Sequence, residues 1–295
     1  MTRNILSKLA CAAVFCLLAA APGARAAECG ATVPCPVAQG FYHMRVPPGW
    51  DGKSLLPAAV FFHGYGSTAL EVMEDEAMGK VLADLGVLLV APNGDEKRWS
   101  YPAKIQGPRD DFAFVDAVLD DLDKRLPIDH SRLWATGFSI GGSMTWYLAC
   151  YRGERFAAFA PIAGAYWEPM PVTCPSGPVS LRHIHGTSDK TVPMAGRSLG
   201  GGRFKQGDVL KSLAQLRARD GCPETPTATS AHGPFACKSW SADACASKRE
   251  IELCLHGGEH EIDPAWIGED YAWVDGLAKA RGHAGLVAPA PSNAN

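Results

Sequence analysis

A serine flanked by glycines lies at residues 137–142, which read Gly-Phe-Ser-Ile-Gly-Gly between an apolar run and a helical pattern. A sharp strand-to-helix turn needs glycine on both sides of the serine, because side chains there would collide with neighbouring elements. The turn lifts the hydroxyl above the sheet and places it at a helix N-terminus, where the dipole favours developing negative charge. The pattern therefore predicts that Ser139 is a nucleophile. The alternative is an ordinary glycine-rich turn with a capping serine.

A serine hydroxyl becomes an effective nucleophile only when a base takes its proton and a third group orients that base. Two later segments supply these groups in the order nucleophile, acid, histidine. Residues 185–193 read His-Gly-Thr-Ser-Asp-Lys-Thr-Val-Pro and predict Asp189 as the acid, and residues 256–260 read His-Gly-Gly-Glu-His and predict His260 as the base. Both segments follow expected strands, and open α/β sheets collect functional groups at the carboxyl ends of their strands.

Other residues compete for these two roles. Asp189 could simply cap a turn, because Thr-Ser-Asp-Lys is also ordinary turn composition. His185 precedes the acid in the chain, and His256 sits at the end of a strand, where packing or a backbone hydrogen bond is the expected role. The base is expected from the loop after the last strand, which favours His260.

The negative charge that develops during acyl transfer needs preorganised N–H donors. One is expected from Ile140, the residue after the serine, and the other from the loop after an earlier strand. Residues 62–67, Phe-His-Gly-Tyr-Gly-Ser, form that loop. We expect the Tyr65 N–H to be the donor, with Gly64 letting the backbone approach the substrate, and His63 to hold the loop in place.

Metal or dinucleotide chemistry fits the sequence poorly. Residues 64–69 imitate a dinucleotide-binding fingerprint, but no acid stands at a second strand end about 20 residues further on. The pairs His183/His185 and His256/His260 could suggest a metal. The first pair lies on a strand of buried character, and two glycines interrupt the second pair. We therefore expect no metal and no cofactor.

The elements that must position these residues alternate between apolar runs and amphipathic segments. This alternation is typical of an α/β fold in which helices cover both faces of a mostly parallel central sheet. Expected parallel strands are 58–62, 86–91, 132–136, 157–162, 179–185 and 250–255, with an antiparallel strand at 41–46. Expected helices are 69–85, 112–126, 141–151, 207–219 and 264–280.

The two ends of the chain are expected to lie outside this fold. Two cations precede an apolar run, and Ala-Arg-Ala at 24–26 has the small-x-small pattern of a signal-peptide cleavage site. The run is shorter than the about 20 apolar residues that a membrane anchor needs. We predict a signal peptide over 1–26, one catalytic domain over 27–283 and a disordered tail over 284–295, in a secreted protein.

Charge limits the partners that this chain can have. Cleavage would remove Arg3, Lys8 and Arg25 and no acid, so the formal net charge moves from −3 to −6. A mildly acidic protein without a basic run has no electrostatic reason to bind nucleic acid or an anionic membrane. The expected partner is a substrate molecule.

Eight of the ten cysteines follow the predicted cleavage site. An even number of cysteines in an exported chain indicates disulfides. Residues 222–248 are polar and are expected to form a disulfide-stapled excursion rather than a domain. Local spacing favours the pairs Cys29–Cys35, Cys150–Cys174 and Cys237–Cys245, which leaves Cys222–Cys254.

Taken together, these motifs resemble the secreted esterases grouped as polyhydroxybutyrate depolymerases and feruloyl esterases. The resemblance covers about Gly40 to Leu277 and rests on 62–66, Trp99, 109–111, 137–142, 185–189 and 258–260. It implies a single-domain α/β-hydrolase fold and ester hydrolysis through an acyl-enzyme. The triad roles then fall on Ser139, Asp189 and His260, and the oxyanion role on the loop at Gly64 and Tyr65.

Three features of the chain bear on the substrate that this resemblance implies. Trp99 stands where the family often has an aromatic residue near the acyl pocket, although it could instead be a core tryptophan. Phe138 replaces the family's usual histidine, and Glu-Ile-Asp at 261–263 replaces the x-Trp-Pro that often follows the catalytic histidine. We find no segment for a separate polymer-binding domain, which favours a soluble or plant-derived ester over an insoluble granule.

The expected activity is therefore hydrolysis of short-chain, hydroxycinnamoyl (feruloyl-type) or hydroxyalkanoate esters. Two alternatives stay open at this point. One is a serine peptidase on the same fold, and the other is a non-catalytic binding protein that keeps the α/β-hydrolase architecture.

Overall fold

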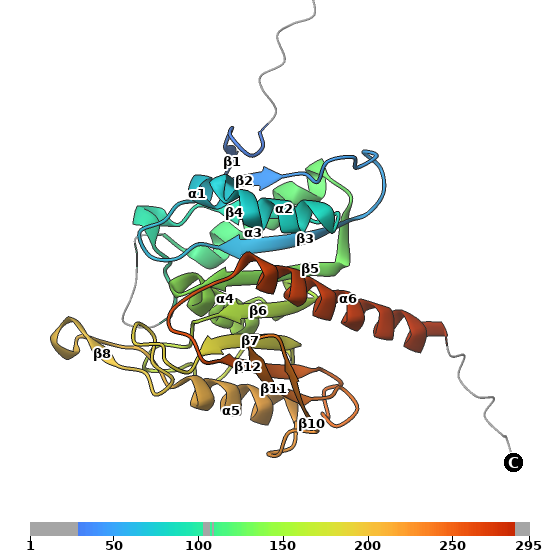
Figure 1. Ribbon diagram of the computed structural model, residues 1–295. Helices are drawn as coiled ribbons and strands as arrows, with labels where there is room; N and C mark the ends of the chain where they lie inside the picture. The colour runs from blue at the N-terminus through green and yellow to red at the C-terminus, as the bar shows by residue number, and fades with distance from the viewer. Residues whose placement is uncertain (1–28, 103–106, 108, 287–295) are drawn as a thin grey trace, which may run out of the picture.

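One large sheet forms the centre of the molecule in the computed structural model, which describes residues 29–102, 107 and 109–286 (Figure 1). The predicted signal peptide and all of the predicted tail beyond residue 286 lie outside the described residues. In sheet order the ten strands are β1 (Cys35–Val37), β2 (Gly40–Arg45), β4 (Leu88–Pro92), β3 (Leu56–Phe62), β5 (Ile128–Phe138), β6 (Ala158–Ile162), β7 (Leu181–Gly186), β12 (Ile251–His256), β11 (Phe235–Trp240) and β10 (Ala228–His232).

The middle of this sheet is parallel, from β4 through β3, β5, β6 and β7 to β12. The strands at both edges pair antiparallel. Every residue of β4, β6 and β7 is buried, which explains why β4 and β6 read as continuous apolar runs rather than as alternating patterns. The third strand, β7, also buries the polar side chains of Arg182, His183 and His185. The mostly parallel sheet expected from the sequence is confirmed, as is the antiparallel strand that leads into it.

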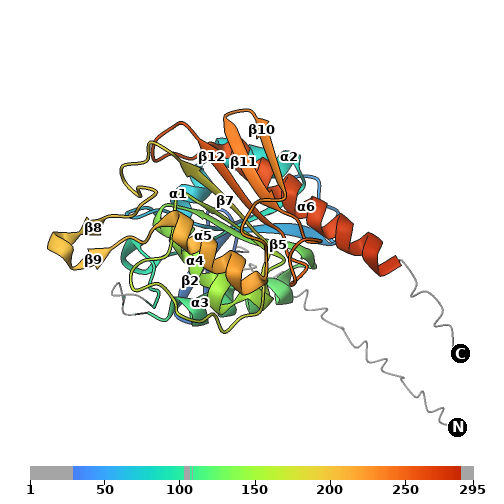
Figure 2. The same ribbon diagram turned by 90° about the horizontal axis from the view of Figure 1, so that it is seen from below.

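Helices cover both faces of the sheet (Figure 2). Their packing creates two separate apolar clusters, one on each face. One face carries α3 (Asp111–Arg125), α4 (Ile140–Tyr151) and α5 (Val209–Asp220). The other carries α1 (Ala69–Glu74), α2 (Glu76–Asp84) and α6 (Pro264–Leu286). Neighbouring residues of β3 divide between the two clusters, because successive side chains of a strand point to opposite faces. None of the described helices has the length and apolar composition that crossing a membrane requires.

The structure corrects the expected elements in two places. The single helix expected over 69–85 is two helices, because Asp75 leaves the helical conformation and caps α2 by accepting a hydrogen bond from the Met78 N–H at 2.9 Å. Residues 222–248, expected as an excursion, contain β10 and β11, which extend the main sheet. All residues of β10 are exposed, so this edge strand has no apolar pattern by which to recognise it.

Two of the four expected disulfides are confirmed, namely Cys29–Cys35 and Cys150–Cys174. The other two pairings are wrong, because the bonds are Cys222–Cys245 and Cys237–Cys254. Cys237 and Cys254 are register partners on β11 and β12. Strand pairing therefore brings these two sulfurs together, although Cys245 is much nearer to Cys237 in the sequence.

Replacing both Cys237 and Cys254 with serine tests the role of this cross-link between the two strands. The bond closes a sequence separation of 17 residues. We expect the free energy of unfolding, measured in guanidinium chloride, to fall by about 3 kcal/mol, because the unfolded chain regains the entropy of the open loop. Peptide mapping of the unreduced wild-type protein should show Cys222 joined to Cys245, and a Cys237–Cys245 peptide would contradict the assignment.

Candidate active site

Three loops leave the carboxyl ends of β5, β7 and β12 and carry the predicted serine, acid and histidine. The small hairpin of β8 (Ser198–Leu199) and β9 (Phe204–Lys205) projects from the same end of the molecule (Figure 1). Parallel strands end at one edge of the sheet, so loops that are far apart in sequence meet there.

Ser139 occupies the turn between β5 and α4 in a strained conformation, with φ at 60° and ψ at −121°. Its backbone N–H donates to the Ile162 carbonyl at 3.0 Å, which ties the turn to the end of β6. A β-carbon on Gly141 would collide with the Phe62 carbonyl, so glycine is required for α4 to pack this closely against β3. The strand–turn–helix context expected for the serine is therefore present, and Ser139 stands at the N-terminus of α4.

Asp189 is a buried carboxylate with both oxygens bonded. Its Oδ1 accepts from the backbone N–H groups of Thr191 and Val192, each at 2.8 Å. Its Oδ2 lies 2.7 Å from Nδ1 of His260. Because a carboxylate only accepts, Nδ1 carries the hydrogen of this contact, and the Nε2 of a neutral His260 ring is then a free acceptor.

The His260 ring lies beside the serine turn. It packs against the ring of Phe138, the residue before Ser139, with the two centroids 4.6 Å apart. The structure thus brings the predicted acid and histidine into contact and packs the histidine against the residue that precedes the predicted serine. A hydroxyl, an imidazole and a buried carboxylate in this order are able to carry out nucleophilic acyl transfer.

Backbone contacts hold the loops after β7 and β12 in register with each other. The Thr187 N–H donates to the His256 carbonyl at 2.8 Å, and the Ser188 N–H donates to the Gly258 carbonyl at 3.1 Å. A β-carbon on Gly186 would collide with the Glu259 carbonyl and lie 2.6 Å from the Gly258 carbonyl. Gly186 therefore permits the close approach that aligns Asp189 with His260.

The rival histidines have structural roles. His185 lies beneath Asp189, with Nε2 2.8 Å from the Val192 carbonyl and 3.6 Å from Asp189 Oδ2. Its Nδ1 is 3.0 Å from Nε2 of His183, whose other nitrogen is 2.9 Å from the Pro161 carbonyl. Burial lowers the pKa of both rings, since desolvation penalises the charged form. The spacing of His183 and His185 suggested a metal pair, whereas in the structure the two rings support the Asp189 loop, a role that no local sequence signal indicates.

His256 likewise serves the backbone, because its Nδ1 accepts from the Gly258 N–H at 3.2 Å. Burial lowers the pKa of His256 as well. Within the part of the chain that the structure describes, one group of possible metal ligands occurs, formed by Cys237, Glu252 and Cys254. Its two sulfurs are joined as a disulfide and therefore provide no thiolate.

The loop after β3 lies against the serine turn. A β-carbon on Gly64 would be 3.8 Å from the β-carbon of Ser139, so the two backbones are close. His63 holds this loop as expected, because its Nε2 accepts from the Gly94 N–H and its carbonyl accepts from Trp99 Nε1, both at 2.9 Å. Burial lowers the pKa of His63, which keeps Nε2 available as an acceptor.

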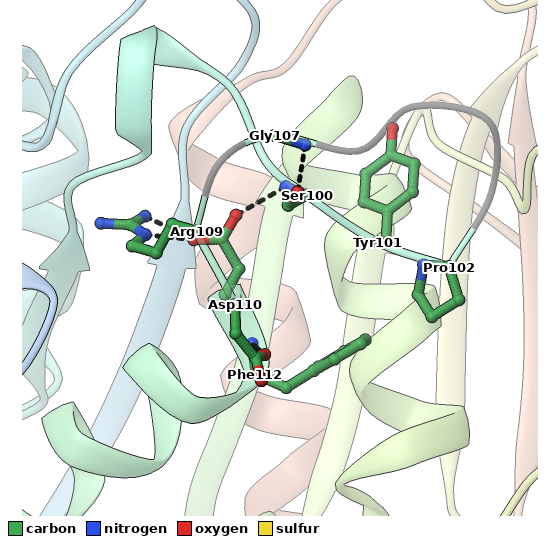
Figure 3. Close-up of a pocket in the computed structure, with 8 residues that line it drawn as sticks. Ser100, Tyr101, Pro102, Gly107, Arg109, Asp110 and Phe112 are labelled. Atoms are coloured by element: carbon green, nitrogen blue, oxygen red, sulfur yellow. Dashed lines mark hydrogen bonds and ion pairs between the residues drawn. The ribbon is translucent and has the colours of Figure 1, made fainter.

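The segment that contains Trp99 is held by a buried ion pair. Asp111 accepts from the Ser100 N–H at 2.5 Å and from Arg109 Nε at 2.7 Å, and Arg109 also donates to the Asn93 carbonyl at 3.0 Å. Arg109 and Ser100, labelled in Figure 3, are among the residues that line a hollow of about 310 Å³. Burial raises the pKa of Asp111, and the Arg109 guanidinium opposes that rise. The two residues therefore fix the position of Trp99.

A cleft of about 380 Å³ opens over the serine, within the size range of small-molecule sites. Four predicted residues line it, namely Tyr65, Trp99, Ser139 and Ile140. Trp99 is almost fully buried and packs in the core, and it also lines the cleft. The two roles expected for Trp99, in the acyl pocket and in the core, are therefore compatible. Gly64 does not line the cleft, although it contacts the serine turn.

Further cleft residues were missed by the sequence reasoning. The apolar ones are Tyr101, Trp167, Leu199 and Phe204, and two arginines, Arg98 and Arg197, lie among them. Trp167 lies in the segment after β6, and its position after an expected strand is a sequence signal that could have identified it as a cleft residue. The others come from the β8–β9 hairpin and the loop after β4, whose approach to Ser139 depends on tertiary folding.

The fold and this site together define a carboxylic ester hydrolase of the α/β-hydrolase class. The model of the esterase family matches residues 41–205, more than half of the chain, and the chain belongs to that family. It is 26% identical over 238 residues to feruloyl esterase C of Emericella nidulans, covering 78% of this chain and 80% of that protein. It is 28% identical over 233 residues to feruloyl esterase D of Neurospora crassa, covering 74% and 73%.

A solved structure supports the fold independently of sequence. The acetyl xylan esterase from Aspergillus awamori superposes with a TM-score of 0.61, covering 80% of this chain and 94% of that chain. The two share only 16% sequence identity, so this likeness concerns the architecture alone.

Gly186→Ala tests whether the contact between the two loops aligns the site. The added β-carbon must push away the loop that carries His260, and a displacement of about 1 Å is enough to lower activity roughly 100-fold. Gly257→Ala is the matched control in the same loop, because a β-carbon there meets nothing within 4 Å. We expect hydrolysis of 4-nitrophenyl acetate to fall only in Gly186→Ala. Equal activity in the two variants would contradict this role for Gly186.

Proposed function

We propose that this protein is a secreted serine esterase that cleaves hydroxycinnamoyl or short-chain esters through an acyl-enzyme. Ser139 is the nucleophile, His260 the general base and Asp189 the group that orients His260. The observation that carries the proposal is the hydrogen bond of 2.7 Å between His260 and a buried Asp189, beside a strained serine that lines a cleft.

In this mechanism His260 Nε2 takes the proton of Ser139 as the hydroxyl attacks the ester carbonyl. The charge of Asp189 stabilises the imidazolium that forms. His260 then gives the proton to the leaving alcohol, and in the second half it activates the water that releases the acid and regenerates Ser139. In each half of the reaction His260 takes a proton from the attacking hydroxyl or water and gives it to the departing oxygen, so the ring ends in its starting state and the scheme uses no cofactor.

The oxyanion formed in these steps is held by the backbone N–H groups of Ile140 and Tyr65. Ile140 is the first residue of α4, where N–H groups have no partner within the helix. The amides of Gly66 and Ser67 are already bonded, to the carbonyls of Lys97 and Gly64. Among the described residues no acceptor is bonded to the Tyr65 amide, so it is free to serve the substrate.

An aromatic acyl group suits the cleft better than a polymer surface does. The walls present Trp99, Tyr101, Trp167 and Phe204, and aromatic rings gain from edge or offset stacking. Relatives named feruloyl esterases support the same substrate class. A volume of about 380 Å³ is within the range of sites that bind one small molecule such as an aromatic acid.

Secretion is supported by two kinds of observation. The described part of the chain contains four disulfides, which form and persist in oxidising compartments. The N-terminal sequence has the features of a signal peptide. N-terminal sequencing of protein recovered from the culture medium or periplasm of the producing cells should begin near Ala27.

Ser139→Ala tests the nucleophile. We expect kcat for 4-nitrophenyl acetate to fall by about 10⁴-fold or more, since the remaining groups cannot form an acyl-enzyme. A fluorophosphonate should label the wild-type protein on Ser139, as shown by mass spectrometry, and should leave the variant unlabelled. Ser131→Ala, at an exposed position on β5, is the control and should keep both properties. Full activity of Ser139→Ala would refute the mechanism.

Phe204→Ala tests the substrate class. Removing this ring from the cleft wall should lower kcat/KM for methyl ferulate by about tenfold, because the aromatic acyl group loses a stacking partner. The value for 4-nitrophenyl acetate should change little, since its acyl group has no ring that could stack on Phe204. Phe41→Ala, on the distant strand β2, is the control. Cleavage of peptide anilides by the wild-type protein in preference to both esters would favour a peptidase instead.

A further inference from the structure

The cleft over Ser139 contains two positively charged residues, although the proposed hydroxycinnamoyl and short-chain esters carry no negative charge. Its lining includes the guanidinium groups of Arg98 and Arg197 and no carboxylate. The chain as a whole has a formal net charge of −3, so positive charge is concentrated here against the overall balance. A cleft lined by one sign of charge attracts ligands of the opposite sign.

Arg98 is only partly satisfied in this position. One terminal nitrogen of its guanidinium pairs with Glu96. Its Nε is buried and, among the described residues, has no hydrogen-bond partner. A buried donor without an acceptor costs free energy, and protein interiors rarely leave one in that state. The second terminal nitrogen of Arg98 also has no partner among the described residues, and it is available to donate to a ligand acceptor in the cleft.

Arg197 is the second cationic residue in the lining of the cleft. It leads into β8, and its Nε lies 3.2 Å from Oε1 of Gln206, a buried residue that also lines the cleft. This contact orients the guanidinium while leaving its terminal nitrogens available. No acidic side chain in the described part of the chain pairs with Arg197.

We propose that the cleft selects esters that carry a carboxylate on the part of the molecule seated in it, and that Arg197 and Arg98 determine this specificity. The inference rests on the proposed function and narrows its substrate class. Guanidinium groups present paired N–H donors that match the two oxygens of a carboxylate, and charge-assisted hydrogen bonds exceed neutral ones in strength. A neutral phenol group on the substrate offers one oxygen and no charge, so it accepts fewer and weaker hydrogen bonds from the two guanidinium groups.

The test compares esters that differ only in charge. One pair is 4-nitrophenyl 4-carboxycinnamate and 4-nitrophenyl 4-carbamoylcinnamate, which place the group on the acid side. The other pair is 4-carboxyphenyl and 4-carbamoylphenyl butanoate, which place it on the alcohol side. For each pair the ratio of kcat/KM, carboxylate over carbamoyl, is measured in the wild-type protein and in Arg197→Gln and Arg98→Gln. The control variant is Arg203→Gln, on the same hairpin, whose guanidinium lies 5.2 Å from the Phe204 ring and does not line the cleft.

In at least one pair, the ratio should fall by about tenfold in Arg197→Gln and in Arg98→Gln, mainly through KM, because each loses a charge-assisted hydrogen bond. The ratio should be unchanged in Arg203→Gln. Raising the salt concentration from about 0.02 to about 0.5 M should lower the wild-type ratio, since exposed charges are screened.

Three results would overturn the inference. The first is a ratio that stays the same, with unchanged activity, in all variants. The second is an equal loss of activity for both members of each pair, which indicates a structural role for the arginines. Hydrolysis of the carbamoyl esters without preference for the carboxylates would remove this inference and leave the proposed function standing. Failure of the wild-type protein to hydrolyse any of the four esters would instead count against the proposed function itself.

Discussion

The close backbone contact between the loops after β7 and β12 is the constraint on which the rest of the site depends. Gly186 allows the Gly258 and Glu259 carbonyls to approach, and two interloop hydrogen bonds fix the register. Only in that register does His260 meet the buried oxygen of Asp189. Backbone contacts of this kind are stiff, so the imidazole is held in position before any substrate arrives.

Three buried histidines support the two loops that make this contact. His183 and His185 support the Asp189 loop from below, while His256 holds the turn that leads to His260. Burial lowers the pKa of these three supporting rings and disfavours their charged form. Neutral rings can accept as well as donate, and that is what a backbone support requires.

The cleft is built from elements that contribute nothing to the sheet itself. The segment containing Trp99 is held through Arg109 and Asp111, and the opposite wall comes from the β8–β9 hairpin. The groups proposed for catalysis therefore lie on loops that directly follow strands of the sheet, whereas the walls of the cleft come from the β8–β9 hairpin and from the long segment after β4. Such a division lets loop residues such as Arg197 and Phe204 set specificity without disturbing the groups proposed for catalysis.

The sequence by itself determined the parallel strands, five of the helical regions and the three residues proposed for catalysis, because these depend on local signals. Buried strands read as apolar runs, and the serine turn needs its glycines at fixed spacing. Tertiary structure alone decided the pairing of Cys237 with Cys254, the exposed strand β10 and the arginines of the cleft. These features join segments that are distant in the chain or have no apolar period, so contacts made only on folding determine them.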